Sequence, residues 1–503
     1  MRLSMLLDMA ADGFGERVAD GEPGRGLTYA GLRDASRRAA RWIADRPVDH
    51  VVLVDTNSEA VPILLFGSGV AGVRFAPLNY RLADEQLTAL LARTAPSVAV
   101  VGEGVIDRLG TVEGVELVER ARFLAELEDV EPLDEDVGVD PEDIAVLLFT
   151  SGTTGDPKAA VLRHRHLTSY VMTTVEFAAA GEDDAALVSV PPYHVAGISA
   201  VLSGTFAGRR TVYLEAFTPD GWVRACTDGA VSQAMVVPTM LGRILDVLDR
   251  DGERLPTLRH LSYGGGRMPI PVVERALTLL PHVDFVNAYG LTETSSTISV
   301  LGPDDHRRAI ASEDPSVRAR LGSVGRPLPG LEVTVQGPDG TIVGPGEHGE
   351  VWVRGEQVAG EYLGRGGGDD AGWFATRDGG WFDEEGFLFL TGRLDDVIVR
   401  GAENISPGEI EAVLLEHPAV REAAVVGIPD TEWGETVAAA VVLSEGVTAS
   451  EVELQHWVRA RLRSSRMPEH VELRTSLPHN ETGKLLRRVL RSELAAHSGR
   501  SET

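Results

Sequence analysis

Short apolar runs alternate with longer amphipathic stretches through the first half of the chain. The runs at 51–55, 97–101 and 145–149 have the length and the nearly continuous apolar character of strands that are buried on both faces. Between such runs, stretches such as 27–44 carry apolar residues at helical spacing. Strands of this kind that alternate with helices favour α/β layers around a mainly parallel sheet.

A different pattern begins near Gly330. Residues 331–355 alternate β-rich runs with turns that contain Gly, Pro and Asp, which predicts a smaller antiparallel unit. Together with the layers that precede it, this unit completes a large N-terminal domain, which we expect to span residues 1–394.

A third pattern fills residues 395–503. It combines a strand-like run at 420–430 with helical patterns at 452–462 and at 485–494, enough for a compact α+β domain of about a hundred residues. The predicted fold class is therefore α/β, with layered α/β subdomains and a small β-rich unit followed by a small, mobile C-terminal domain.

Composition excludes several classes of partner. The 503 residues carry 47 Lys and Arg against 76 Asp and Glu, a formal net charge of −29, which disfavours nucleic acids and anionic lipid surfaces. The apolar stretch 61–73 is shorter than the roughly 20 residues of a membrane span, so we expect buried core there and no stable membrane insertion. With Cys226 as the sole cysteine and no signal peptide at the N-terminus, we expect a cytoplasmic protein.

Lysine is almost absent from the chain. Lys158 and Lys484 are its two lysines, so 47 − 2 leaves 45 arginines. Biased codon use explains a surface rich in arginine, but a compact ammonium group on a flexible stem serves chemistry that a planar guanidinium does not. Both lysines are therefore candidates for a functional role.

A glycine- and hydroxyl-rich loop directly follows the apolar run that ends at Phe149. Backbone N–H groups, hydroxyl groups and one cation together make a phosphate cradle, although the spacing differs from a Walker A loop. The alternative is an ordinary polar turn between a strand and a helix. The residues of the loop are Thr150, Ser151, Gly152, Thr153, Thr154, Gly155, Asp156, Pro157 and Lys158.

This loop is similar to the phosphate-binding loop of the adenylate-forming superfamily, which includes acyl-CoA synthetases, adenylation domains and luciferases. Residues 289–294, Tyr-Gly-Leu-Thr-Glu-Thr, resemble the second signature of that family, and 263–266, Tyr-Gly-Gly-Gly, precede it. The resemblance implies that Glu293, with Thr150, binds Mg²⁺ and that Thr292 contacts the α-phosphate. It further implies nucleotide contacts from Gly264, Gly265, Gly266, Tyr289 and Gly290, with the adenine between the tyrosine and the glycines.

Two further segments, 374–378 and 391–396, resemble the next signatures of the family. The resemblance implies that Asp378 accepts hydrogen bonds from the ribose hydroxyls, that Arg393 contacts the sugar or the phosphate, and that Asp395 is the hinge of a mobile domain. Arg377 departs from the pattern, because a glycine is usual at its position.

The C-terminal region carries the last two signatures. Gly401 opens a segment similar to the loop that lines the pantetheine tunnel, with Ala402 where a second glycine is common. Residues 480–484 resemble the terminal signature, whose lysine, here Lys484, reaches the carboxylate and the α-phosphate. Both lysines of the chain thus fall on the two lysine positions of the family, and the signatures follow in the family's order from Leu27 onward.

The family's carboxylic-acid pocket corresponds to a largely uncharged set of residues. His194 matches a histidine that gates this pocket, although a lone histidine among apolar residues is as often part of a core. Since the set contains no cation, an apolar, aryl or polycyclic acid is favoured over a dicarboxylate. The set consists of Tyr193, His194, Val237, Pro238, Ser262 to Gly264, Asn287 and Gly290.

The resemblance implies an acid–thiol ligase that uses ATP, Mg²⁺ and CoA. The carboxylate would become acyl-AMP with loss of pyrophosphate and would then pass to the CoA thiol. A carrier protein as acceptor, a partner enzyme that performs the thiolation, and a nucleotide-binding regulatory protein without turnover stay open as alternatives. The oligomeric state is open between a monomer and a homodimer. The implied catalytic residues are Lys158, His194, Thr292, Glu293 and Lys484.

Overall fold

The first sheet is built from the apolar runs of the N-terminal part. The computed structural model describes residues 1–134, 137–150, 157–364, 366–369, 371–401, 403–430, 433–444, 446–479 and 485–498. Within them, one sheet has the order β6–β5–β3–β4–β7–β8 and is parallel except for the β7–β8 pair. Its strands are β3 (His50–Val54), β4 (Arg74–Pro77), β5 (Ser97–Val101), β6 (Val115–Glu119), β7 (Ile144–Thr150) and β8 (Lys158–Arg163).

A second, larger sheet has the order β15–β14–β13–β12–β11–β9–β10–β1–β2 among the described residues. The strands from β13 to β1 are parallel, whereas β14, β15 and β2 run antiparallel to their neighbours. Parallel strands end at a common edge, so the segments that follow β9, β11, β12 and β13 lie side by side. The strands are β1 (Val18–Asp20), β2 (Leu27–Thr28), β9 (Ala185–Val188), β10 (Arg210–Tyr213), β11 (Gln233–Val236), β12 (His260–Gly264), β13 (Asp284–Leu291), β14 (Ser296–Leu301) and β15 (Arg326–Pro327).

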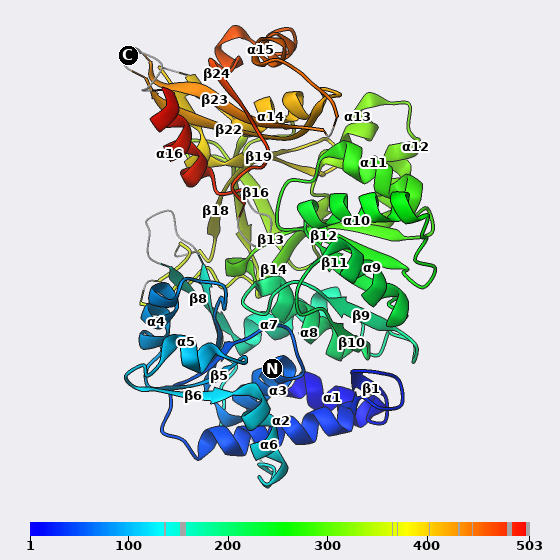
Figure 1. Cartoon of the computed structure of the whole chain (residues 1–503), viewed down its shortest axis with the longest axis vertical. Helices are drawn as coiled ribbons and strands as arrows, with labels where there is room; N and C mark the ends of the chain where they lie inside the picture. Colours follow the sequence, from blue (N-terminus) through cyan, green and yellow to red (C-terminus); the bar gives the residue numbers. More distant parts are fainter. Residues whose placement is uncertain are drawn as a thin grey trace.

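Helices cover both sheets (Figure 1). Side chains of α1, α2, α3, α7, α8 and β3 join in one apolar cluster, and α3 is buried along its whole length. Thr28 caps α2, because its hydroxyl accepts from the Gly31 N–H at 3.1 Å. The helices are α1 (Ser4–Phe14), α2 (Tyr29–Ala44), α3 (Ala60–Ala71), α4 (Asp84–Ala92), α5 (Val105–Leu109), α6 (Arg120–Glu128), α7 (His164–Thr174), α8 (Val195–Ala207), α9 (Pro219–Asp228), α10 (Pro238–Asp251), α11 (Ile270–Leu279), α12 (Pro303–Ala311) and α13 (Pro315–Arg318).

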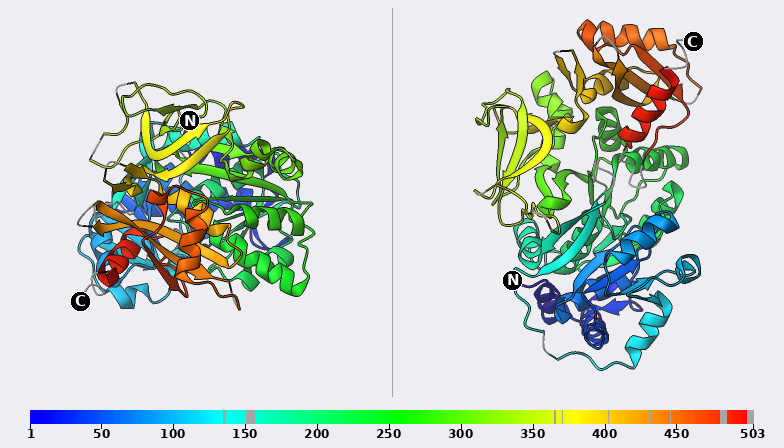
Figure 2. Two further views of the ribbon diagram at one scale, coloured as in Figure 1. Left: turned by 90° about the horizontal axis from the view of Figure 1, so that it is seen from above. Right: turned by 90° about the vertical axis from the view of Figure 1, so that its left-hand side faces the viewer.

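A small antiparallel sheet follows in the chain and lies beside the second sheet (Figure 2, right). Its inner face packs on Tyr289 and Ile298 of the second sheet, in a shared apolar cluster. This contact brings the β18–β19 hairpin against β13. The strands are β16 (Glu332–Gln336), β17 (Gly349–Arg354), β18 (Phe374–Phe382) and β19 (Leu388–Arg393).

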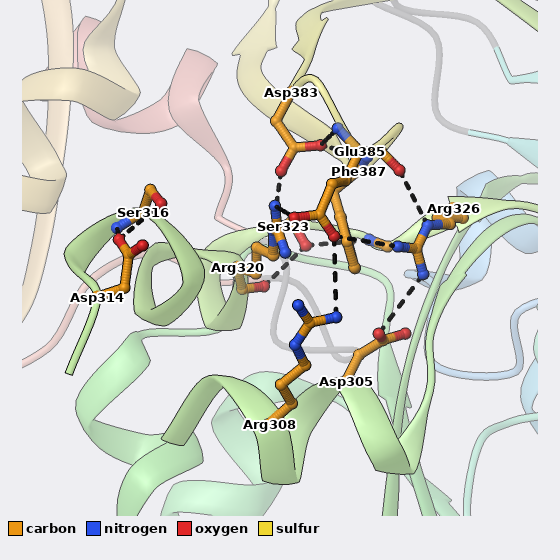
Figure 3. A network of polar contacts seen from close by, with 11 residues as sticks. Asp305, Arg308, Asp314, Ser316, Arg320, Ser323, Arg326, Asp383, Glu385 and Phe387 are labelled. Atoms are coloured by element: carbon orange, nitrogen blue, oxygen red, sulfur yellow. Dashed lines mark hydrogen bonds and ion pairs between the residues drawn. The ribbon is translucent and has the colours of Figure 1, made fainter. Parts of the chain in front are cut away.

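A polar network fixes the turn of that hairpin to the second sheet (Figure 3). The buried guanidinium of Arg320 donates to Asp383 at 2.8 Å and lies 2.9 Å from Glu385. The ring of Phe387 lies between two guanidinium groups, 4.4 Å from that of Arg320 and 3.9 Å from that of Arg326. Because both arginines belong to the second sheet and its adjoining turns, the hairpin is held in one orientation toward β13.

The C-terminal region forms a further sheet at one end of the molecule (Figure 1). The short turn η3 (Leu394–Asp396) leads into it from β19. The Arg267 side chain, which follows β12, donates to the Gly408 carbonyl and links the two parts of the chain. The elements are β20 (Ile398–Arg400), β21 (Glu403–Ile405), α14 (Pro407–Leu415), β22 (Val420–Asp430), β23 (Gly434–Leu443), α15 (Glu451–Arg459), β24 (His470–Arg474) and α16 (Arg487–Ser498), and the other 3₁₀ turns of the chain are η1 (Thr292–Thr294), η2 (Ala319–Gly322) and η4 (Ser464–Arg466).

The predicted fold class is confirmed. The runs expected at 51–55, 97–101 and 145–149 are β3, β5 and β7, with ends that differ by at most one residue. The stretch 61–73, expected as core, is occupied by the buried helix α3. In the described part of the chain, every helix is too short or too polar to cross a bilayer.

Asp20, on β1, makes the stability of the fold depend on pH. Its side chain is buried, and desolvation together with the nearby Glu59 charge raises its pKa to about 7. A raised folded pKa stabilises the protein at low pH, and this contribution is lost as the pH rises from about 4 to about 7. We expect Asp20→Asn to be more stable than the wild type at pH 8 by about 2–4 kcal/mol and nearly equal at pH 4.

Thermal unfolding of both proteins between pH 4 and 8 tests this expectation. The melting temperature of the variant minus that of the wild type should increase across this range. A difference that does not change with pH would show that Asp20 is not the group responsible.

Candidate active site

The common edge of the second sheet brings together four segments that carry predicted site residues, namely those at the ends of β9, β11, β12 and β13. Cα atoms pair across β11, β12 and β13, with Val236 opposite Tyr263 and Gly264 opposite Ala288. A Cβ on Gly264 would lie 2.2 Å from the Ala288 carbonyl oxygen, so this position requires glycine. A Cβ on Gly265 would contact Val237, and one on Gly266 would contact Pro238, at 3.7 Å each. The predicted adenine and acid segments therefore adjoin one another.

Three aromatic rings meet beside this edge. Tyr193 packs edge-on against Tyr80 with ring centroids 5.7 Å apart, and the His194 ring lies 4.6 Å from that of Tyr193. His194 directly precedes α8, and the next turn of the helix packs tightly, because a Cβ on Gly197 would lie 2.6 Å from the Pro191 carbonyl oxygen. Tyr80 follows β4 of the first sheet, so the aromatic group spans both sheets.

Asn287 and Gly290 occupy the β13 side of the edge. The Asn287 amide donates to the Ser323 carbonyl at 3.0 Å, which fixes the orientation of this predicted pocket residue. A Cβ on Gly290 would lie 1.6 Å from the Ser296 carbonyl oxygen, so only glycine fits where the register of the β13–β14 pair shifts. Both residues therefore have structural constraints of their own beside the predicted contacts with ligands.

Tyr289, Asp378 and Arg393 form a buried polar group. The Tyr289 hydroxyl donates to the Asp378 carboxylate at 2.6 Å, and Arg393 lies 3.4 Å from the other carboxylate oxygen. Burial and the Asp378 charge raise the pKa of Tyr289 well above its ordinary value, so the tyrosine stays a proton donor. The hydrogen bond from Tyr289 thereby orients the Asp378 carboxylate.

The backbone at Arg377 is strained. Its φ is +62°, in the left-handed region that glycine occupies without penalty. The side chain is exposed and directly precedes the buried Asp378. Arg377 therefore occupies the position where the family pattern has glycine, and the backbone keeps the conformation that suits glycine.

Glu293 is held through both its backbone and its side chain. Its carbonyl accepts from the N–H groups of Ala359 at 2.8 Å and Gly360 at 2.9 Å. Its carboxylate accepts a hydrogen bond from the Tyr362 hydroxyl. Burial and the Glu293 charge raise the pKa of Tyr362, so its hydroxyl remains protonated and donates. The neighbouring Thr292 shares the 3₁₀ turn η1 with Glu293.

Thr150 and Lys158 close the two ends of the predicted phosphate loop. They are opposite each other in the antiparallel β7–β8 pair, and the Thr150 hydroxyl lies 3.4 Å from the Lys158 carbonyl. The loop therefore joins two strands, and the alternative of a turn between a strand and a helix is wrong, because the apolar residues after Lys158 extend the sheet. Ser151, Gly152, Thr153, Thr154 and Gly155 lie outside the described residues.

The predicted C-terminal residues lie apart from this group or outside the described chain. Gly401 has a φ of +60°, and its N–H donates to the Trp433 carbonyl at 2.7 Å. Asp395 is exposed in η3. Ala402 and Lys484 lie outside the described residues.

The donor set suits a metal ion that arrives with a nucleotide. Among the described residues, no group of three or more His, Cys, Asp or Glu side chains could hold a metal ion alone. Magnesium sites often use one or two carboxylates and complete the shell with phosphate oxygens and water. Glu293, together with the Thr150 hydroxyl, fits such a site.

Tyr80 and Tyr362 were missed by the sequence analysis. Tyr80 follows a short strand, and Tyr362 lies in a glycine-flanked segment that pairs with β8 only through an isolated bridge at Ala160. Neither lies in a recognised motif, so a signal for them is absent from the local sequence pattern.

Comparison with known proteins agrees with this arrangement. A family model described as AMP-binding enzyme matches residues 7–363, and one described as AMP-binding enzyme C-terminal domain matches residues 409–484. The chain is 34% identical over 482 residues to a feruloyl-CoA synthase of an Amycolatopsis species, which covers 93% of this chain and 94% of that protein.

Two further similarities bear on the acceptor and on the nucleotide. The chain is 32% identical over 501 residues to a fatty acid–acyl-carrier-protein ligase of Streptomyces coeruleorubidus, covering 95% of this chain and 93% of that protein. The structure of o-succinylbenzoate coenzyme A synthetase from Bacillus subtilis in complex with ATP and a magnesium ion matches with a TM-score of 0.80 and 28% identity. That match covers 96% of this chain and 98% of the other.

Arg377→Gly should stabilise the protein. Glycine removes the cost of a left-handed residue, which is about 1–2 kcal/mol. It also loses more backbone entropy on folding, which costs about 0.5–1 kcal/mol, so the net stabilisation is about 1 kcal/mol. We expect a melting temperature about 2 °C higher by calorimetry.

A matched change separates strain from a general effect of glycine. Arg421 is an exposed arginine of β22 outside the positive-φ residues, so Arg421→Gly should lower the melting temperature. A lower melting temperature for Arg377→Gly as well would contradict the strain.

Proposed function

The chain belongs to the family of AMP-binding enzymes, and we propose that it joins an aromatic carboxylic acid to the thiol of CoA. It is an AMP-forming acid–thiol ligase. We propose the acid, the acceptor and the role of each residue. One observation carries this proposal. At the edge of the second sheet, beside the base of the phosphate loop, lies a group of polar side chains, here called the junction, that consists of Asp378, Tyr289 and Glu293.

Two displacements make up the reaction. A carboxylate oxygen forms a bond to the α-phosphorus of ATP while the bond from that phosphorus to pyrophosphate breaks, which gives acyl-AMP. The CoA sulfur, after loss of its proton, then bonds to the acyl carbon and AMP leaves. A side-chain nucleophile is unnecessary, so the protein contributes positioning and charge stabilisation.

The nucleoside is recognised by the Tyr289–Asp378 pair and the glycines beside it. Asp378 accepts from the ribose hydroxyls, and the Tyr289 bond keeps one of its oxygens oriented. The adenine lies between the Tyr289 ring and the flat backbone of Gly264–Gly266. Arg393, beside Asp378, contacts the sugar or the α-phosphate.

The phosphates are bound at the neighbouring end of the junction. Thr292, Lys158 and the loop 151–155 contact the phosphate oxygens, and Glu293 with Thr150 holds Mg²⁺. When bound, Mg²⁺ neutralises part of the charge on the phosphates. Lys484 contacts the carboxylate and the α-phosphate during the first displacement.

An aromatic acid fits the composition of the predicted pocket. Tyr80, Tyr193 and His194 pack as a group of rings, and aromatic rings pack favourably edge-to-face or offset against one another. Val237 and Pro238 add apolar surface beside them, and His194 gates the entrance. The feruloyl-CoA synthase and the o-succinylbenzoate enzyme, which resemble this chain, carry aromatic acids in their names.

The second displacement requires a rearrangement of residues 395–503. Asp395 lies in the short turn between the antiparallel sheet and the C-terminal sheet, where a few backbone dihedrals can rotate the domain. The rotation removes Lys484 and brings Gly401 to the acyl-AMP to line the path of the pantetheine arm. ATP and CoA are cytoplasmic metabolites, so the reaction belongs to the cytoplasm.

A carrier protein is the second candidate acceptor. The similarity to a fatty acid–acyl-carrier-protein ligase favours it over a partner enzyme. The phosphopantetheine thiol of a carrier has the same chemistry as that of CoA, so the first displacement is identical in the two cases.

Pyrophosphate release over a panel of aryl, fatty and polycyclic acids, with and without CoA, tests the activity. We expect release that depends on ATP, Mg²⁺ and an aryl acid, and acyl-CoA by mass spectrometry when CoA is present. Lys484→Ala should abolish the release of pyrophosphate. Lys158→Arg keeps the positive charge and changes the shape of the cationic group, so its rate of release shows whether the charge of Lys158 alone is sufficient. Turnover with fatty acids alone would overturn the proposed class of acid. Formation of acyl-AMP without a thioester would overturn CoA as the acceptor.

Asp378→Asn tests the recognition of the nucleoside. A hydrogen bond to a charged group contributes about 1.5–3 kcal/mol, so kcat/KM for ATP should fall by about 10- to 100-fold. Tyr289→Phe should cause a smaller loss, because it removes the orienting bond and keeps the carboxylate. The KM for the acid should stay unchanged in both variants under saturating ATP. A rise in the KM for the acid instead would place the ribose elsewhere.

A further inference from the structure

Residues 359–363, here called the strap, tie the second sheet to the first. At one end, the N–H groups of Ala359 and Gly360 donate to the Glu293 carbonyl at 2.8 and 2.9 Å. At the other end, the Leu363 N–H donates to the Ala159 carbonyl at 2.8 Å, and the Val161 N–H donates to the Glu361 carbonyl at 3.0 Å. The backbone of the strap is therefore fixed on both sides of Tyr362.

A side-chain contact adds to this anchoring. Arg163, at the end of β8, forms a two-point ion pair with Glu361 at 2.7 and 3.0 Å. Gly360 has a φ of +56°, and a Cβ there would lie 3.0 Å from the Phe374 ring. The strap is thus held by its backbone hydrogen bonds and by Glu361, and its course does not require the Tyr362 hydroxyl.

The side chain of Tyr362 lies between two opposite charges. Its hydroxyl donates to the Glu293 carboxylate, and the Lys158 ammonium nitrogen lies 5.4 Å from the centre of its ring. In the part of the chain that the structure describes, no carboxylate lies within ion-pair distance of that ammonium group. One aromatic residue thus contacts the anion through its hydroxyl and the cation through its ring.

Keeping these charges separate matters for the binding of a nucleotide. Unit charges of opposite sign attract strongly at about 4 Å in a partly buried site. A direct Lys158–Glu293 pair would occupy the carboxylate and the ammonium group with each other. Each would then have to be released before it could meet a metal ion or a phosphate.

We propose that Tyr362 is a positioning residue that holds Glu293 and Lys158 apart, so that the carboxylate is oriented for the metal and the ammonium group for the phosphate. The proposal rests on the proposed function, because the nucleotide and its metal are the ligands that these two groups would receive. Residues that hydrogen-bond a metal ligand commonly change metal affinity by about 10- to 100-fold when they are removed.

Two substitutions separate the hydroxyl from the ring. Tyr362→Phe removes the bond to Glu293 and keeps the ring beneath Lys158. Tyr362→Leu removes both, so Lys158 and Glu293 can pair directly. Tyr29→Phe is the matched control, because it also removes a tyrosine hydroxyl that donates a hydrogen bond, here to the Arg209 carbonyl at 2.6 Å.

The measurement is the binding of Mn²⁺ in place of Mg²⁺ to the full-length enzyme with α,β-methylene-ATP, which resists cleavage. Electron paramagnetic resonance gives the free Mn²⁺, and calorimetry with a chelator gives the affinity for the nucleotide alone. Tyr362→Phe should weaken Mn²⁺ binding about tenfold and leave the metal-free nucleotide affinity unchanged. Tyr362→Leu should weaken both, and Tyr29→Phe should weaken neither.

Wild-type Mn²⁺ affinity in Tyr362→Phe, or an equal loss in Tyr29→Phe, would overturn the proposal. Melting temperatures show whether each variant is folded, and a fold defect in Tyr362→Leu leaves the Tyr362→Phe comparison decisive. If the wild type releases no pyrophosphate with any acid, the assigned reaction fails, yet the Mn²⁺ comparison still decides the role of Tyr362.

Discussion

The site depends on the attachment of the two parallel sheets to each other at their carboxyl edges. Each sheet alone carries half of the predicted machinery: the first ends in the phosphate loop between Thr150 and Lys158, and the second ends in Glu293. The strap joins these halves through backbone hydrogen bonds to Ala159 on one side and to Glu293 on the other. Hydrogen bonds between backbone groups do not depend on which side chains are present, so the fold itself sets the distance between the two halves of the site.

A second attachment orients the end of the site where we propose that the nucleoside binds. The Tyr289–Asp378 hydrogen bond links β13 to the β18–β19 hairpin, while the pairing of Arg320 with Asp383 fixes the hairpin turn to the second sheet (Figure 3). A preorganised carboxylate needs little rearrangement when a ligand arrives, which lowers the cost of binding. The same logic explains why a strained residue, Arg377, is tolerated beside Asp378.

Sequence patterns predicted the fold class and named most residues of the candidate site, for reasons that are local. Buried parallel strands need continuous apolar runs, and positions where two backbone segments approach each other closely need glycine, as at Gly264 and Gly290. Tyr80 and Tyr362 could not be predicted, because each acts through contacts with residues far away in the chain. The β7–β8 hairpin was also missed, since a strand after a glycine-rich loop looks locally like the start of a helix.

The most direct test of the account is a crystal structure with an acyl-sulfamoyl adenosine, a stable mimic of acyl-AMP. We expect the adenine between Tyr289 and Gly264–Gly266 and the ribose hydroxyls on Asp378, which still accepts a hydrogen bond from Tyr289. The acyl group should point toward Tyr193, and Glu293 should remain bonded to Tyr362. A nucleoside bound away from Asp378 would contradict the account.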